Sequence, residues 1–81
     1  MDAEAFNARL SALVDIWCER RELKALAGLL PAWLGNNGLT DGWEELCSAL
    51  RTTSNHRQLP ESERDMLKRL WIELDVVLRN R

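Results

Sequence analysis

The sequence has little of what an enzyme or a metalloprotein needs. Its 81 residues include a single histidine, His56, and two cysteines, Cys18 and Cys47. A zinc site needs about four nitrogen, sulfur or oxygen ligands, so these three separated residues make no recognisable set. His56 lies in a polar stretch where no nucleophile or orienting group is expected within hydrogen-bonding reach, and an exposed bystander is the simpler interpretation. We therefore expect no catalytic residue, no metal, no cofactor and no enzymatic activity.

The sequence also lacks an excess of positive charge. Eleven lysines and arginines are outnumbered by 13 acidic residues, and the formal net charge is −2. Proteins that bind DNA or RNA usually carry a strong positive excess, because neutralising phosphates supplies much of their affinity. The segment Gly35–Gly38 is too short for a phosphate-binding loop and has no lysine. These absences argue against nucleic acid as a partner, and a mildly acidic surface is better matched to a protein, particularly a basic one.

No segment is apolar enough to cross a membrane. The longest uncharged stretch, Ala25–Thr40, is interrupted by Pro31 and Gly35. The first residues, Met1–Phe6, have neither the basic nor the apolar region of a signal peptide. We expect no membrane partner and a cytoplasmic location. The two cysteines are then expected to be partly buried free thiols, because nothing indicates an oxidising compartment.

Apolar residues recur with helical spacing, and no segment alternates as a strand would. The pattern predicts four helices: one at about 2–20, a second that starts within 19–22 and reaches 30, and two more at about 41–51 and 60–80. A single rod over residues 2–30 would be about 43 Å long, too long for a compact domain of this size, so two helices are favoured over one bent rod. We predict the all-α class, as a compact bundle of four helices forming one domain over residues 1–81.

Each predicted helix has an apolar stripe that is expected to be buried. The stripes are Phe6, Leu10, Leu13 and Trp17; Leu23, Leu26 and Leu30; Trp43, Leu46, Cys47 and Leu50; and Leu67, Leu70, Trp71, Leu74 and Leu78, widened by Met66 and Val77. Pro31 is expected to kink the second helix or to open a short turn through residues 32–34, and Gly35 fits a left-handed C-cap. Thr40 or Asp41 is expected to cap the third helix, and Pro60 to take the first position of the fourth.

One candidate binding surface lies around the turn after the second helix. Trp33 follows Pro31, where a tryptophan is either a partly exposed binding anchor or part of the core. Asp41, Glu44 and Glu45 crowd the start of the third helix. Helix capping accounts for Asp41 and Glu44 but less well for Glu45. We interpret the three carboxylates as an acidic surface that docks into a basic cleft.

A second candidate surface is formed by Ile72 and Val76 on the fourth helix. At 100° per residue the two side chains fall nearly opposite Leu67 and Leu74. They therefore form a small apolar ridge on a polar face, suited to another helix or to a partner protein. A slightly wider core is the alternative interpretation.

Five further segments belong together: Trp17–Leu26, Leu29–Pro31, Gly38–Leu46, Ala49–Arg51 and Leu59–Arg64. Together they resemble a family of small proteobacterial proteins whose genes lie beside Rhs-type or type VI-secreted toxins. The most specific piece of this resemblance is Gly-Leu-Thr-Asp-Gly-Trp at residues 38–43. The resemblance implies an immunity protein, a cytoplasmic binder that blocks the active site of one toxin, and it assigns no toxin-contacting residue.

Two other functions remain open from the sequence. The first is a helical adaptor or regulatory subunit, which could form a homodimer through Ile72 and Val76. The second is a DNA-binding regulator in which the second and third helices form a helix-turn-helix. The second is disfavoured, because phosphates would repel a recognition helix that begins with Asp41, Glu44 and Glu45.

Overall fold

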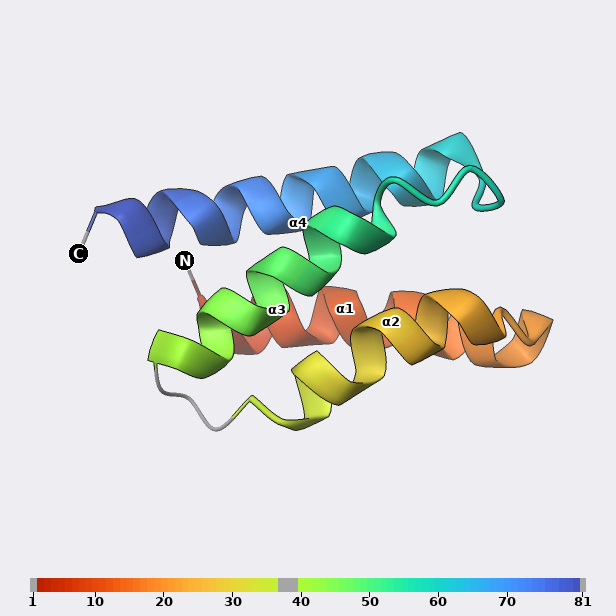
Figure 1. The fold of residues 1–81 in the computed structure, drawn as a ribbon, viewed down its shortest axis with the longest axis horizontal. Coiled ribbons are helices and arrows are strands. Elements are labelled where there is room, and N and C mark those ends of the chain that lie inside the picture. The colour runs from red at the N-terminus through yellow and green to blue at the C-terminus, as the bar shows by residue number, and fades with distance from the viewer. Residues whose placement is uncertain (1, 37–39, 81) are drawn as a thin grey trace.

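Four α-helices make up most of the chain in a computed structural model that describes residues 2–36 and 40–80 (Figure 1). They are α1 (Ala3–Arg20), α2 (Leu23–Leu34), α3 (Thr40–Thr53) and α4 (Glu61–Arg79), and no strand occurs in these ranges. The predicted all-α class and four helices are confirmed. The radius of gyration is 11.9 Å, close to the roughly 11.7 Å expected for a compact chain of this length.

The separation of α1 from α2 depends on one residue, Arg21. Asp2 caps the start of α1 by accepting a hydrogen bond from the backbone N–H of Glu4 at 3.0 Å. At the other end, Arg21 adopts the left-handed conformation (φ 57°, ψ 45°), and the backbone N–H of Glu22 donates to the carbonyl oxygen of Trp17. This hydrogen bond closes the end of the helix. The chain therefore reverses, and the prediction of two helices is confirmed.

The end of α2 differs from the prediction. The helix continues through Pro31 to Leu34. Gly35 was expected to be left-handed, but its φ of −82° and ψ of −4° are right-handed. A glycine suits this position for a steric reason, since a Cβ there would lie 2.8 Å from the carbonyl oxygen of Pro31. The turn predicted to follow extends into residues 37–39, which lie outside the described ranges.

The observed ends of α3 and α4 differ by one or two residues from the predicted ends. α3 begins at Thr40, and the cap predicted at Thr40 or Asp41 borders residues 37–39, which lie outside the described ranges. At its other end α3 extends to Thr53, whose hydroxyl donates to the carbonyl oxygen of Ala49 at 2.7 Å. Pro60 precedes α4 as its N-cap and is not the first helical residue.

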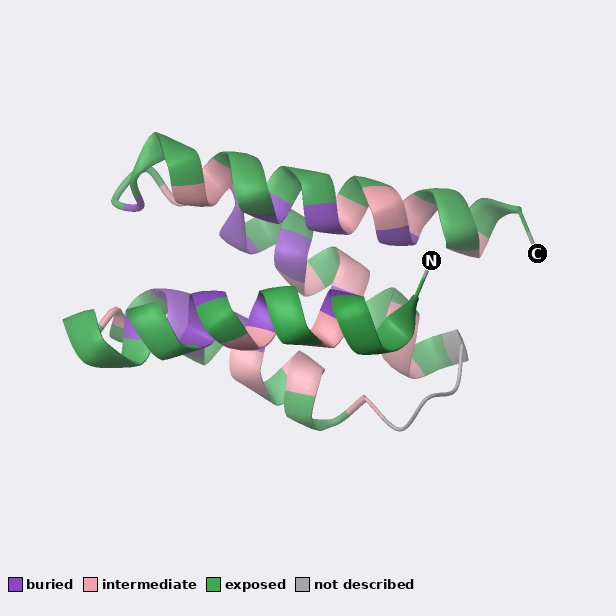
Figure 2. Cartoon of the chain, turned by 180° about the vertical axis from the view of Figure 1, so that it is seen from behind, coloured by how far each residue is buried: buried purple, intermediate pink, exposed green. Residues whose placement is uncertain are grey.

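Leucines from all four helices, with Phe6 and Trp17, form most of the core (Figure 2). The buried apolar residues are Phe6, Leu10, Leu13, Val14, Trp17, Ala25, Leu26, Leu29, Leu46, Leu50, Leu59, Leu67, Leu70 and Leu74. The predicted stripe of α1 is confirmed. In α2 the buried stripe is Ala25, Leu26 and Leu29, and Leu23, predicted to be buried, is 71% exposed.

Some residues assigned to the core lie further out. Trp43, expected to be fully buried, is half-buried and meets the ring of Phe6 edge-on, with ring centroids 6.0 Å apart. Met66 and Val77, expected to widen the buried face of α4, are 40% and 38% exposed. Cys18 is an exposed free thiol, whereas Cys47 is half-buried as expected. The core is therefore narrower than the sequence pattern suggested, and apolar side chains remain on the surface.

Candidate protein-binding surfaces

A groove of about 520 Å³ lies between α1 and α4. Its walls are Arg9, Ala12, Leu13 and Ile16 from α1 and Ser62, Asp65, Met66 and Arg69 from α4. The lining includes two large apolar side chains that remain accessible, Ile16 at 44% and Met66 at 40% exposure. A hollow of this volume falls within the range of ligand-binding sites. Its accessible apolar side chains are the kind that a partner molecule covers.

The groove exists because α1 and α4 are held apart. The extensive helix–helix contacts in the described ranges join consecutive helices: α1 with α2, α2 with α3, and α3 with α4. Long side chains bridge α1 and α4 instead. At one end Arg9 binds Glu73, with 2.8 Å between the nitrogen and oxygen atoms, and at the other end Arg20 binds Glu63. This pairing shows that the two helices run antiparallel.

Glu63 is the centre of the polar bridge at one end of the groove. One carboxylate oxygen accepts a hydrogen bond from the indole N–H of the fully buried Trp17 at 2.7 Å and another from Arg20 at 2.9 Å. Its other oxygen accepts a second bond from Arg20. Burial alone would raise the pKa of Glu63, but these hydrogen bonds and the positive charge of Arg20 outweigh it, so the pKa lies below its usual value. The bridge therefore holds Glu63 in its ionised form.

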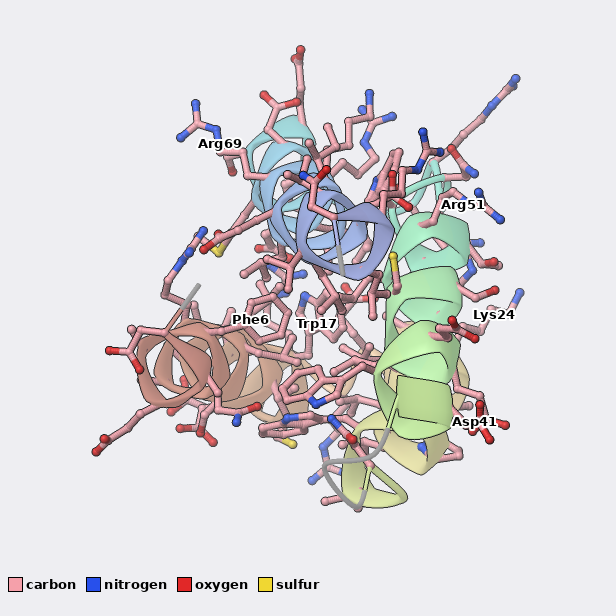
Figure 3. All side chains as sticks on the ribbon, turned by 90° about the vertical axis from the view of Figure 1, so that its left-hand side faces the viewer. Phe6, Trp17, Lys24, Asp41, Arg51 and Arg69 are labelled. Carbon is pink, nitrogen blue, oxygen red and sulfur yellow. The ribbon has the colours of Figure 1, made fainter. Side chains whose placement is uncertain are left out.

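The predicted acidic surface at the start of α3 is divided by the structure. Asp41, Glu44 and Glu45 are all exposed. Glu45 borders a depression of about 430 Å³ between α2 and α3, whereas Glu44 borders another of about 300 Å³ that α4 also lines. Figure 3 shows Asp41 and Arg69 on opposite sides of the molecule. The three carboxylates are accessible, but Glu44 and Glu45 face different hollows.

Trp33 packs inward, against α1. Its ring is half-buried on the core, and its indole N–H donates to the side-chain oxygen of Asn7 at 3.1 Å. The hydrogen bond and the packing give Trp33 a structural role, which weakens its assignment as a free anchor. Glu45, by contrast, lines the hollow between α2 and α3. Trp33 and Glu45, which were predicted to form one surface, therefore contact different helices.

Ile72 and Val76 are exposed, at 48% and 50%. They share one face of α4 with Asp65 and Arg69, because residues 65, 69, 72 and 76 have helical i, i+4, i+7 and i+11 spacing. The apolar ridge that the sequence predicted therefore begins where the α1–α4 groove ends. Sequence reasoning missed the groove itself, because Ile16 lies off the main stripe of α1 and Met66 was assigned to the core.

A third surface carries positive charge. Lys24, His56, Arg57 and Gln58 line a depression of about 300 Å³. His56, expected to be exposed, is half-buried. In the described residues no three histidine, cysteine or acidic side chains converge as a possible metal site, and no helix is long and apolar enough to span a membrane.

The chain matches no protein-family model, and neither a curated protein nor a solved structure matches it.

Proposed function

We propose that this protein is a cytoplasmic immunity protein, which binds a secreted bacterial toxin and inhibits it by covering the toxin's active site. The resemblance of segments such as Trp17–Leu26 and Gly38–Leu46 to proteins encoded beside such toxins supports the identity of the partner. The exposed apolar groove between α1 and α4 supports the more general proposal that the chain works by binding a protein. No catalytic role is assigned to any residue.

The groove is a better candidate for the toxin contact than the acidic start of α3. It presents Ile16 and Met66 as accessible apolar groups, and apolar groups near the centre of an interface supply most of its affinity. Exposed carboxylates such as Glu44 and Glu45 act mainly on the rate of association. An acidic surface therefore steers a basic toxin, while the groove determines how long the complex lasts.

The test uses the purified toxin domain encoded by the neighbouring gene, in a catalytically inactive form, with binding kinetics measured on a sensor surface. Ile16→Asp should accelerate dissociation about tenfold or more, because it places a charge in a desolvated contact. Leu23→Asp is the matched control, since Leu23 is 71% exposed and does not line the groove. The control should leave dissociation unchanged.

The acidic surface is tested with the same toxin domain. Glu44→Lys combined with Glu45→Lys should slow association and reduce its dependence on salt concentration. Asp15→Lys combined with Glu19→Lys makes the same change in net charge on exposed positions of α1. Equal effects of the two double variants would show that only net charge matters. Absence of any binding by the wild-type chain would refute the proposed function.

The adaptor alternative is favoured by the exposed ridge of Ile72 and Val76. If the ridge joins two copies, sedimentation equilibrium should detect a dimer that Val76→Asp dissociates. The immunity function requires no dimer, so the two proposals differ in a measurement that needs no toxin.

A further inference from the structure

The α1–α4 groove carries two opposite charges on its α4 wall, Asp65 and Arg69, which lie four positions, or about one helical turn, apart. Because α1 and α4 run antiparallel, Arg9 lies at the same end as Arg69, near the Arg9–Glu73 ion pair. Ser62 and Asp65 lie towards the other end, near the Arg20–Glu63 bridge. The apolar lining from Ile16 and Met66 lies along the groove between them. A partner that fits must be apolar where it faces Ile16 and Met66, and it must carry a basic group for Asp65 and an acidic group for Arg69, about one helical turn apart.

The two charges on the α4 wall are available to a partner. Among the described residues neither Asp65 nor Arg69 forms an ion pair, whereas Arg9 is already bound to Glu73. Figure 3 shows Arg69 extending away from the core. An additional basic group near Asp65 and an acidic group near Arg69 would therefore form new ion pairs without breaking existing ones.

The shape of the groove favours a helix over an extended peptide. Both walls are helices, whose backbone groups are already hydrogen-bonded within each helix, so an extended peptide would find no strand edge to pair with. A helix satisfies its own backbone groups. The ion pairs at the two ends are eleven positions apart on α1 and ten on α4, which corresponds to about 15–16 Å, or three helical turns.

We propose that the groove binds one short amphipathic helix of a partner protein, with apolar residues on the side facing Ile16 and Met66, a basic residue against Asp65 and an acidic residue against Arg69. This inference deepens the proposed function, since it describes which part of a partner enters the groove. It does not depend on that partner being a toxin.

The probes are three fluorescent, stapled helical peptides of about 14 residues, with leucines at i, i+3, i+4 and i+7 spacing. One carries a lysine and a glutamate four positions apart beside the leucines, to match Asp65 and Arg69, and the second and third carry only lysines or only glutamates at those two positions. Fluorescence anisotropy with the full chain should show the mixed peptide binding about threefold to tenfold more tightly than either uniform peptide, the range expected for rim ion pairs.

Single charge changes in the groove should then change which peptide is preferred. Asp65→Lys should shift the preference to the glutamate peptide, and Arg69→Glu should shift it to the lysine peptide. Asp15→Lys, on an exposed position outside the groove lining, should leave the preference unchanged. Ile16→Asp should weaken binding of the mixed peptide about tenfold or more, and Leu23→Asp should not.

Three outcomes would overturn the inference. They are no binding of any peptide at concentrations up to about 1 mM, a peptide preference that Asp65→Lys and Arg69→Glu leave unaltered, or a homodimer of the free chain that Ile16→Asp dissociates. The last result would make the occupant a second copy. If the toxin domain fails to bind while the mixed peptide binds the groove, the proposed function fails and this inference stands.

Discussion

Replacing Glu63 by alanine should destabilise the protein by about 2–3 kcal/mol, most of it through Trp17. The indole N–H of Trp17 is fully buried and has Glu63 as its acceptor, and an orphaned buried donor costs about 1–3 kcal/mol. The bond to Arg20 adds little to this, because the Arg20 side chain is 37% exposed and solvent screens its charge. A domain of this size has roughly 4–12 kcal/mol of total stability. The loss should therefore lower the Tm by about 10–20 °C.

A double-mutant cycle with Trp17→Phe isolates the central hydrogen bond, because phenylalanine removes the indole N–H. In that background Glu63→Ala should lower the free energy of unfolding only by the contribution of the Arg20 bond. The coupling energy between Trp17 and Glu63 should therefore be about 1–2 kcal/mol. Urea unfolding followed by circular dichroism supplies all four free energies. Glu61→Ala, exposed in the same helical turn, is the control and should change stability by about 0.5 kcal/mol or less. A coupling energy near zero would refute the assignment of Glu63 as the acceptor that Trp17 requires.

The same bridge predicts a dependence on pH. The pKa of Glu63 is lower in the folded protein than its usual value, so the unfolded chain binds the proton more readily. The stability that Glu63 contributes is present above the unfolded-state pKa of about 4.3 and is lost as the pH falls through the folded-state pKa. Glu63→Gln removes this titration, so the gap in unfolding free energy between wild type and variant should narrow below about pH 4. A gap that stays constant in acid would contradict the argument.

Three further measurements examine other parts of the fold. Arg21→Gly should stabilise the protein by about 0.5–1 kcal/mol in urea unfolding, because glycine adopts the left-handed conformation at no steric cost; a loss of stability would show that the Arg21 side chain is needed. Iodoacetamide should alkylate the exposed Cys18 about tenfold or more faster than Cys47, whose pKa is raised by burial, and mass spectrometry would expose equal rates as a contradiction. Trp43→Ala should cost about 2–3 kcal/mol, since the ring is half-buried against Phe6, and an unchanged Tm would show that this contact contributes nothing.

Helical periodicity was sufficient to predict the number and type of the elements, because the stripe in each helix records which side is removed from water. The stripe Phe6, Leu10, Leu13 and Trp17 is buried as expected. In α2, where leucine and alanine occur on every side, periodicity selected Leu23 and missed Leu29. Local composition cannot choose between faces that are equally apolar. The packing of α1 and α3 against α2 made that choice.

The sequence predicted the starts of α1 and α4 to within a residue, near residue 2 and at Pro60. The cap that Asp2 provides was seen only in the structure. Residue type did not predict the backbone conformation at two helix ends. Gly35 is right-handed, and its lack of a Cβ prevents a clash with the carbonyl oxygen of Pro31. Arg21 adopts a left-handed conformation that its residue type disfavours. Both outcomes depend on how the chain must turn for its helices to pack, which no single residue type encodes.

The sequence by itself determined that this chain folds as four helices, because the apolar residues recur with helical spacing. It placed Ile72 and Val76 nearly opposite the buried leucines, but only the structure decided between an exposed ridge and a wider core, and both side chains are exposed. The existence of the α1–α4 groove, by contrast, depends on the tertiary structure and was not predictable from the sequence pattern. Ile16 and Met66 are 50 positions apart in the chain, and each resembles the edge of an ordinary apolar stripe. They border one hollow because side-chain bridges, and not close backbone packing, join α1 to α4.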